Sequence, residues 1–431
     1  MPIDQQPQAS TGLAAGRQPR SLWRNRDYLL LVCGQVVSQL GSQFSLLAFP
    51  LLALFISGSP AHAGLIGSMR LLPYFMLSLP AGALIDRWDR KRLMFVCNVG
   101  RGLCLLSIPI ALALGHLTLL QLYLVSLLEG TFFVFFDLAE LASLPHVVAR
   151  EQIIAATTQS EMAYNLSFML GPALGGIIYG LGKSLPFLLD ACSYLISLCS
   201  LLLIKTKFQR TRETRPEKLW IEMRAGLLWI WHQPLILFLA CMGTLFHLFF
   251  DGIALIVIVL ARQTHAAPLL IGLVLAMDGV GSTLGLLLFS RLSKRFSFHA
   301  ISSVCYWIWA MLWLTMLLAG NMLTLGIILA LIYCAIMIFD LAQFSYRRLL
   351  IPDELQGRVN SVFRLIAYSG APLGLTLAGL LLQIWGPSMT ITVLGIGVIG
   401  MALLITFNSH LRRARPLSEI SREKFVEIPA D

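Results

Sequence analysis

The chain has 431 residues, of which 57% are hydrophobic and only 13% are charged, and its mean hydropathy is +0.78. A water-soluble protein of this length needs a larger share of charged residues at its surface, so the composition excludes that class. The net charge of +10 lies mainly in short links between apolar runs, which argues against a nucleic-acid-binding face.

Twelve apolar runs follow one another along the chain, each long enough for a helix that crosses a bilayer. They cover approximately 28–55, 64–85, 93–114, 118–138, 160–181, 186–204, 234–261, 269–290, 299–319, 323–343, 361–385 and 388–407. The runs predict an all-α integral membrane protein with two six-helix bundles, at 28–204 and 234–407. A polar N-terminal segment (1–27) and a polar C-terminal tail (408–431) flank the bundles.

The first run carries a polar stripe on one helix face, formed by Gln35, Ser38, Gln39, Ser42 and Gln43. Polar side chains inside a membrane must face protein or water. The stripe therefore predicts either hydrogen bonding to neighbouring helices or a cavity wall, and Gln35 and Gln39 are candidates for the cavity.

The link after the second run has six charged residues within seven positions, so it must lie in water. Gly82 precedes it, and its charged residues are Asp86, Arg87, Asp89, Arg90, Lys91 and Arg92. This order of residues resembles the loop between helices two and three of the Major Facilitator Superfamily. Ile85 and Asp89 depart from that pattern. The resemblance implies that the loop gates the inner side of a transporter, with Asp86 acting on a neighbouring helix end.

The fifth run contains Gly171-Pro172-Ala173-Leu174-Gly175-Gly176, which resembles the core of the superfamily's antiporter motif. Proline kinks a helix, and glycines let helices approach closely. The motif predicts an exporter through the resemblance, and close helix packing is the alternative that the residues alone support.

Positive charges fix the expected orientation. Of the 32 Lys and Arg residues, 27 lie in the termini and the links on one side, and only Lys183 and Arg262 lie opposite. Basic loops stay in the cytoplasm, so both termini are expected inside a cell membrane. The basic link 205–233 joins the two halves, and Trp220, Met223, Leu227 and Trp231 recur in it at helical spacing. This spacing favours an amphipathic helix on the membrane surface over a plain linker.

The two halves repeat one another. Phe136-Asp137-Leu138-Ala139 matches Phe339-Asp340-Leu341-Ala342, and the segment from Gly82 to Arg87 aligns with that from Ser290 to Arg295. Gly171-Pro172-Ala173-Leu174-Gly175 likewise matches Ala371-Pro372-Leu373-Gly374. A transporter with its site between two related halves is the physical expectation.

Acidic residues inside apolar runs are costly and therefore functional candidates. The candidates singled out among them are Glu129, Asp251 with His247 one turn before it, and Asp278. Burial favours the protonated form of a carboxylate, so Glu129 is predicted to carry a coupling proton and Asp251 to tune substrate affinity. The alternative for each acid is a buried ion pair, for which Arg70 and Arg101 are available in the N-terminal half.

No motif of an enzyme or an ATPase is present, and the eight cysteines form no metal-site spacing, so neither catalysis, a cofactor nor a metal is expected. Short matches along residues 22–407 resemble the siderophore (enterobactin) and macrolide efflux branch of the superfamily. They are Leu22 to Asp27, Arg70 with Pro73, Phe136-Asp137, Leu144-Pro145, Arg150 to Gln152 and Pro186 to Asp190.

This resemblance implies a proton-driven exporter of a lipophilic small molecule such as a drug, macrolide or siderophore. Expected partners are the substrate, protons and membrane lipids but no nucleic acid, and the chain is expected to be monomeric. An importer or lipid flippase of the same fold is one alternative, and a non-transporting sensor or scaffold is another.

Overall fold

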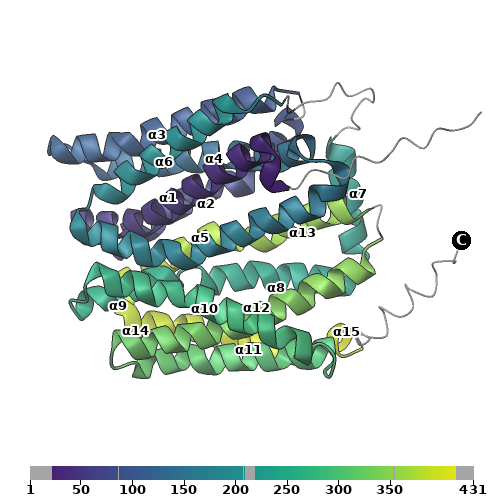
Figure 1. The fold of residues 1–431 in the computed structure, drawn as a ribbon. Coiled ribbons are helices and arrows are strands. Elements are labelled where there is room, and N and C mark those ends of the chain that lie inside the picture. Colours follow the sequence, from purple (N-terminus) through teal and green to yellow (C-terminus); the bar gives the residue numbers. More distant parts are fainter. Residues whose placement is uncertain (1–21, 86, 207, 209–218, 353–354, 414–431) are drawn as a thin grey trace, which may run out of the picture.

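The computed structural model describes residues 22–85, 87–206, 208, 219–352 and 355–413, and the regular elements within those ranges are all helices (Figure 1). The first half contains α1 (Arg26–Ser57), α2 (Pro60–Ile85), α3 (Arg90–Ala113), α4 (Leu119–Val147), α5 (Ile153–Leu181) and α6 (Leu185–Leu203). The second half contains α8 (Pro234–Phe250), α9 (Ile253–Gln263), α10 (Pro268–Leu292), α11 (Phe298–Thr315), α12 (Met322–Leu350), α13 (Gln356–Tyr368) and α14 (Gly370–Phe407). The helix α7 (Leu219–Trp231) lies between the halves in sequence.

Nine helical segments of the described residues are long and apolar enough to cross a membrane. A helix occupies each of the twelve predicted runs, but α2 and α5 are not among the nine, and α13 with α14 counts as one segment. The all-α membrane fold class is therefore confirmed, whereas twelve crossings remain a prediction.

Two predicted runs differ from simple helices. The seventh run is divided at Asp251 and Gly252 into α8 and α9, and a Cβ atom at Gly252 would meet the Cβ atom of Ala378 in α14. The eleventh and twelfth runs join through a kink at Gly386, whose φ of 73° is a backbone conformation that glycine adopts without strain. Pro387 follows at once and cannot continue the preceding hydrogen-bond ladder.

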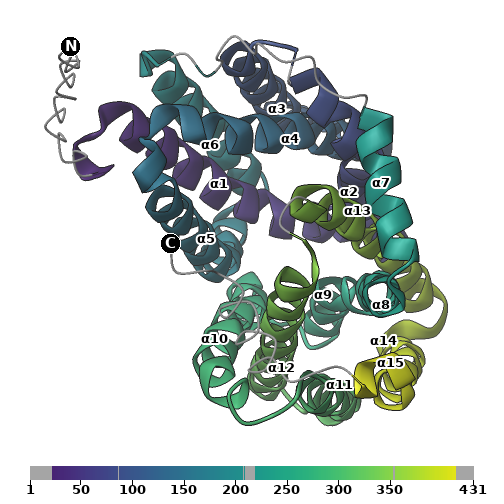
Figure 2. The ribbon, with the colours of Figure 1, turned by 90° about the vertical axis from the view of Figure 1, so that its right-hand side faces the viewer.

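The linker helix α7 packs against α13 rather than standing alone. A Cβ atom at Gly226 would lie 2.8 Å from the carbonyl oxygen of Arg358, and Ile230 is fully buried. Leu227 and Trp231 of the predicted apolar stripe are exposed, which fits a helix with one face on protein and another available to lipid. Figure 2, viewed from the end at which α7 lies, shows it running along one flank of both helix groups.

The main contacts between the two halves are made by two pairs of helices, α2 with α14 and α5 with α10. Both crossings depend on glycine. A Cβ atom at Gly64 would lie 3.0 Å from the Cα atom of Gly379, and one at Gly176 would lie 3.2 Å from the Cα atom of Gly272. At these distances the helix backbones leave no room for larger side chains.

The crossings are equivalent in the internal repeat. Gly64 and Gly272 are 208 positions apart, which is the offset between Gly82 and Ser290. Both crossings lie toward the end that carries Lys183 and Arg262, where Arg262 also donates a hydrogen bond of 3.1 Å to the carbonyl oxygen of Leu54. The halves are thus closed against each other at that end.

We expect Gly176→Leu to separate the halves at this end, because the new side chain would collide with the backbone of α10. A cysteine introduced at Ala173, in a background without the eight native cysteines, should then react faster with a water-soluble maleimide. Gly180→Leu in the same helix is the control, because Gly180 has no neighbour within 4 Å of a built Cβ atom. Equal labelling in both variants would contradict the role of the crossing.

Candidate functional site

A cavity of about 720 Å³ lies between the halves, with residues from α1, α2, α4, α5, α13 and α14 in its wall. On α2 its wall begins at Leu71, beyond the Gly64 crossing and toward Ile85, so the cavity lies on the side of the basic loop at 87–92. Its polar wall residues are Gln35, Gln39, Tyr74, Asp137, Glu140, Thr157, Ser160, Glu161, Tyr164, Arg364 and Tyr368.

Three carboxylates and one guanidinium group line this cavity. Asp137 and Glu140 are three residues apart on α4 and therefore share a face, while Glu161 comes from α5. Within the described part of the chain, none of these three acids takes part in an ion pair. Arg364 from α13 donates a hydrogen bond of 2.9 Å to the Tyr74 hydroxyl on α2, so this contact links the two halves inside the cavity.

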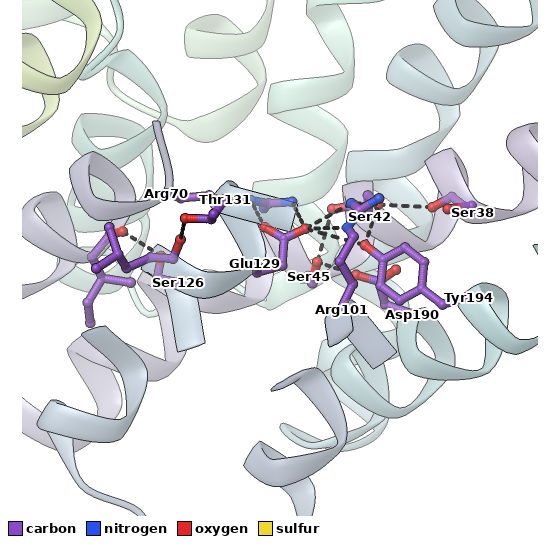
Figure 3. Close-up of polar contacts among 12 residues, drawn as sticks. Ser38, Ser42, Ser45, Arg70, Arg101, Ser126, Glu129, Thr131, Asp190 and Tyr194 are labelled. Carbon is purple, nitrogen blue, oxygen red and sulfur yellow. Dashed lines mark hydrogen bonds and ion pairs between the residues drawn. The ribbon is translucent and has the colours of Figure 1, made fainter. Parts of the chain in front are cut away.

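Glu129 lies outside the cavity wall, in a buried charge cluster of the N-terminal half (Figure 3). Its Oε2 atom is 2.7 Å from Nε of Arg70, and its Oε1 atom is 2.8 Å from Nη2 of Arg101. Glu129 is completely buried and Arg101 is 2% exposed. Glu129 therefore forms the buried ion pair that the sequence left open as an alternative. The role of Glu129 in transport stays a prediction.

The cluster extends to α1 and α6. Arg101 donates from Nη2 to the Ser42 hydroxyl at 3.2 Å, and its guanidinium group lies 4.2 Å from the ring centroid of Tyr194. The Ser42 and Tyr194 hydroxyls are 2.9 Å apart. Asp190, also fully buried, accepts a hydrogen bond of 2.5 Å from Ser45. Two cations and two acids from four helices thus share one site with the serines of α1.

The candidates in the C-terminal half lie apart from this cluster. His247 Nδ1 is 3.1 Å from both carboxylate oxygens of Asp251. The centroid of the His247 ring lies 4.3 Å from that of Tyr368, which lines the cavity, and the two rings are tilted by 33°. Asp278 accepts a hydrogen bond of 2.9 Å from Ser282 in its own helix. The pair of His247 and Asp251 therefore lies one residue behind the cavity wall, and Asp278 is not part of the wall.

Two basic residues of the predicted gating loop donate to backbone carbonyl oxygens, and one of these lies at a helix end. Arg90 donates to the carbonyl oxygens of Ala142 at 2.8 Å and Phe208 at 3.3 Å. Lys91 donates to the carbonyl oxygen of Ile204 at 2.6 Å, at the end of α6. Positive charges at carboxyl ends of helices are favourable. Arg87 and Arg92 are exposed, and Asp86 lies outside the described residues.

Asp89, which departs from the superfamily pattern, has a local explanation. Its carboxylate accepts a hydrogen bond of 3.0 Å from the backbone N–H of Arg92 and so caps the first turn of α3. Gly82 has open space around it.

The antiporter-like motif lies at helix contacts. A Cβ atom at Gly171 would collide with the Gln43 side chain on α1, and one at Gly175 would lie 3.2 Å from the Cα atom of Phe44. Gly176 faces α10, and the carbonyl oxygen of Pro172 lies against Gly272. The packing alternative therefore accounts for the positions of these residues, and their link to export remains a prediction.

Sequence reasoning placed Gln35 and Gln39 near a cavity, and both line it. It did not nominate Asp137, Glu140, Glu161 or Arg364. The predicted fourth run ended at 138 and the fifth began at 160, so Glu140 fell in a presumed loop and Glu161 fell at its edge. The repeated Phe-Asp-Leu-Ala segment was the available signal for Asp137, and three-residue spacing on a continued helix was the signal for Glu140.

The sequence profile of the transmembrane secretion effector family matches residues 21–430. This chain belongs to that family. It is thus a transporter of the Major Facilitator Superfamily, and the resemblance drawn from its motifs is confirmed.

Relatives with described activities support this assignment. The multidrug efflux pump Tap of Mycolicibacterium fortuitum is 24% identical over 89% of this chain and 96% of its own length. The enterobactin exporter EntS of Salmonella choleraesuis is 27% identical over 80% of this chain and 84% of its own length.

Solved structures confirm the fold. A bacterial homologue of the iron transporter ferroportin, in an inward-facing state, gives a TM-score of 0.71 at 16% identity and covers 88% of this chain and 98% of its own. A bacterial homologue of the lysosomal transporter Spinster, also inward-facing, gives a TM-score of 0.67 at 14% identity, with 93% and 97% covered. These likenesses concern the fold alone.

We expect the folded protein to be destabilised when the charge of Glu129 is removed. Glu129→Gln leaves Arg70 and Arg101 without their shared carboxylate, and breaking a buried ion pair costs about 3–5 kcal/mol. We expect this variant to unfold at a clearly lower temperature in detergent than the double variant Glu129→Gln/Arg101→Gln, which also removes one of the two cations. Thermal unfolding of the purified proteins measures this. A double variant that is less stable than the single one would show that the two side chains are not coupled in this way.

Proposed function

We propose that this chain is a proton-driven exporter of lipophilic small molecules and that the cavity is its substrate site. One observation carries the proposal: a cavity of about 720 Å³, with apolar and acidic walls, lies between two related halves that close at the other end. Pockets of this size suit drug-sized molecules. Two relatives of this chain, a multidrug efflux pump and an enterobactin exporter, support the outward direction.

The proposed orientation has both termini in the cytoplasm and the cavity open to the cytoplasm. It is supported by the positive-inside rule, since the side of the cavity bears the basic loop and the opposite side bears Lys183 and Arg262. In this orientation the described conformation takes up its substrate from inside the cell. Asp86 in the inner loop retains its proposed gating role.

The coupling proton is better assigned to Asp137 and Glu140 than to Glu129. Protonating Glu129 would remove the negative charge that compensates Arg70 and Arg101, which is unfavourable at a buried site. Asp137 and Glu140 line the cavity without an ion pair among the described residues, so water can deliver a proton to them. His247 and Asp251 act on substrate affinity through Tyr368, whose ring contacts the His247 ring.

The alternatives predict different behaviour. An importer would use the same fold in the opposite direction, and a lipid flippase would act on labelled phospholipid. A sensor or scaffold would have no use for three unpaired acids in a cavity. Export is favoured because the efflux relatives match this chain over most of its length.

We expect everted membrane vesicles containing this protein to accumulate ethidium or Nile red when respiration acidifies their lumen. Nigericin, which collapses the pH gradient, should release the accumulated probe. Asp137→Asn/Glu140→Gln should abolish gradient-driven accumulation because it removes the exchangeable protons, whereas Glu151→Gln, an exposed acid outside the cavity, should not. Full accumulation by the double variant would refute the coupling assignment, and release rather than uptake would reverse the direction.

Orientation is tested separately. A single cysteine at His116 or Thr264, in the cysteine-free background, should react with an impermeant maleimide added to intact cells. A single cysteine at Ser421 in the C-terminal tail should react only after the cells are permeabilised. The opposite pattern would invert the proposed topology.

A further inference from the structure

We propose that the cavity selects bulky organic cations and that Asp137, Glu140 and Glu161 determine this preference. The inference deepens the proposed export function by naming its substrate class, but it concerns binding and is testable without transport.

The ionised side chains of the cavity wall give it a net negative charge. The wall contains three carboxylates and one basic side chain, Arg364, among its described residues, so the fully ionised wall has a net charge of −2. The chain as a whole has a net charge of +10, so the cavity differs in sign from the protein around it. In a cavity with low-dielectric walls, such an excess raises the local concentration of cations.

The carboxylates are also available to a ligand. Glu129 and Asp190, the buried acids of the same half, are occupied by Arg70, Arg101 and serine hydroxyls. Asp137, Glu140 and Glu161 have no ion pair within the described ranges. A cationic ligand could therefore pair with them without displacing an existing partner.

Aromatic rings indicate that the cation is organic. The wall contains six of them: Tyr74, Phe75, Phe133, Tyr164, Phe168 and Tyr368. Aromatic faces attract delocalised cations and also bury their apolar surface. A compact hydrated ion would use neither the rings nor a volume of about 720 Å³.

Arg364 shows that the cavity accommodates such a group. Its guanidinium group is planar and delocalised, and it lies 6.0 Å from the ring centroid of Tyr368 while it donates to the Tyr74 hydroxyl at 2.9 Å. The Arg364 side chain is therefore an organic cation that the cavity wall already contains. Its positive charge offsets part of the negative charge of the wall, so its removal should strengthen cation binding.

The experiment measures equilibrium binding of tetraphenylphosphonium and tetraphenylborate to the purified full-length protein in detergent. These two probes have nearly the same shape and opposite charge. We expect tetraphenylphosphonium to bind at least tenfold more tightly. Its affinity should fall as the pH is lowered, because protons neutralise the same carboxylates.

Variants identify the residues. Asp137→Asn/Glu140→Gln/Glu161→Gln should lower the affinity for tetraphenylphosphonium at least tenfold. Arg364→Gln should raise it about threefold or more, a gain that misfolding cannot produce. Equal binding of the two probes, or an unchanged affinity in the triple variant, would overturn the inference.

The binding experiment and the vesicle experiment can fail independently of each other. Accumulation of neutral Nile red in vesicles with no preference for tetraphenylphosphonium in binding would leave export standing and reject the cation preference. Selective cation binding without any gradient-driven accumulation would reject export and keep the binding site.

Discussion

The buried charge cluster around Glu129 is the interaction on which the N-terminal half depends. Serines of α1, Arg70 of α2, Arg101 of α3, Glu129 of α4 and two residues of α6 meet there. An unpaired charge inside a bilayer is strongly unfavourable, so each of these helices must keep its register and rotation for the others to remain satisfied. The cavity wall on α4 begins one turn beyond Glu129, at Phe133, and its geometry follows from this fixed register.

The C-terminal half is built on a different interaction. Phe250 contacts Trp309, Trp313 and Tyr333 with ring centroids 5.3–6.2 Å apart, and Trp309 and Trp313 are almost fully buried. Aromatic packing tolerates small rotations better than an ion pair does, because it has no strict donor and acceptor geometry. The two halves thus share a sequence repeat and equivalent contact helices, but one interior is built on charges and the other on aromatic rings. The acids of the cavity wall all come from the N-terminal half.

The sequence predicted the fold because the length of each apolar run and the charge of each loop can be read locally. In a bilayer these two quantities determine which segments cross and on which side the loops lie. It also predicted the polar face of α1 and offered Arg70 and Arg101 as partners of Glu129. It could not choose between a free and a paired Glu129, since that depends on helices 28 and 59 residues away in the chain. It missed Glu140 and Glu161 because hydropathy marks where a membrane ends rather than where a helix ends. Asp86 and the 1–21 and 414–431 segments lie outside the described residues.

The two glycine crossings have a mechanical consequence. Two rigid bodies that are held together at two fixed points retain only one motion, a rotation about the line that joins the points. Gly64 with Gly379 and Gly176 with Gly272 are such points, related by the internal repeat. A rocking motion about this axis would widen one end of the molecule as it narrows the other, with little sliding of helices. The absence of side chains at the four positions thus allows the crossings to act as pivots and removes other degrees of freedom.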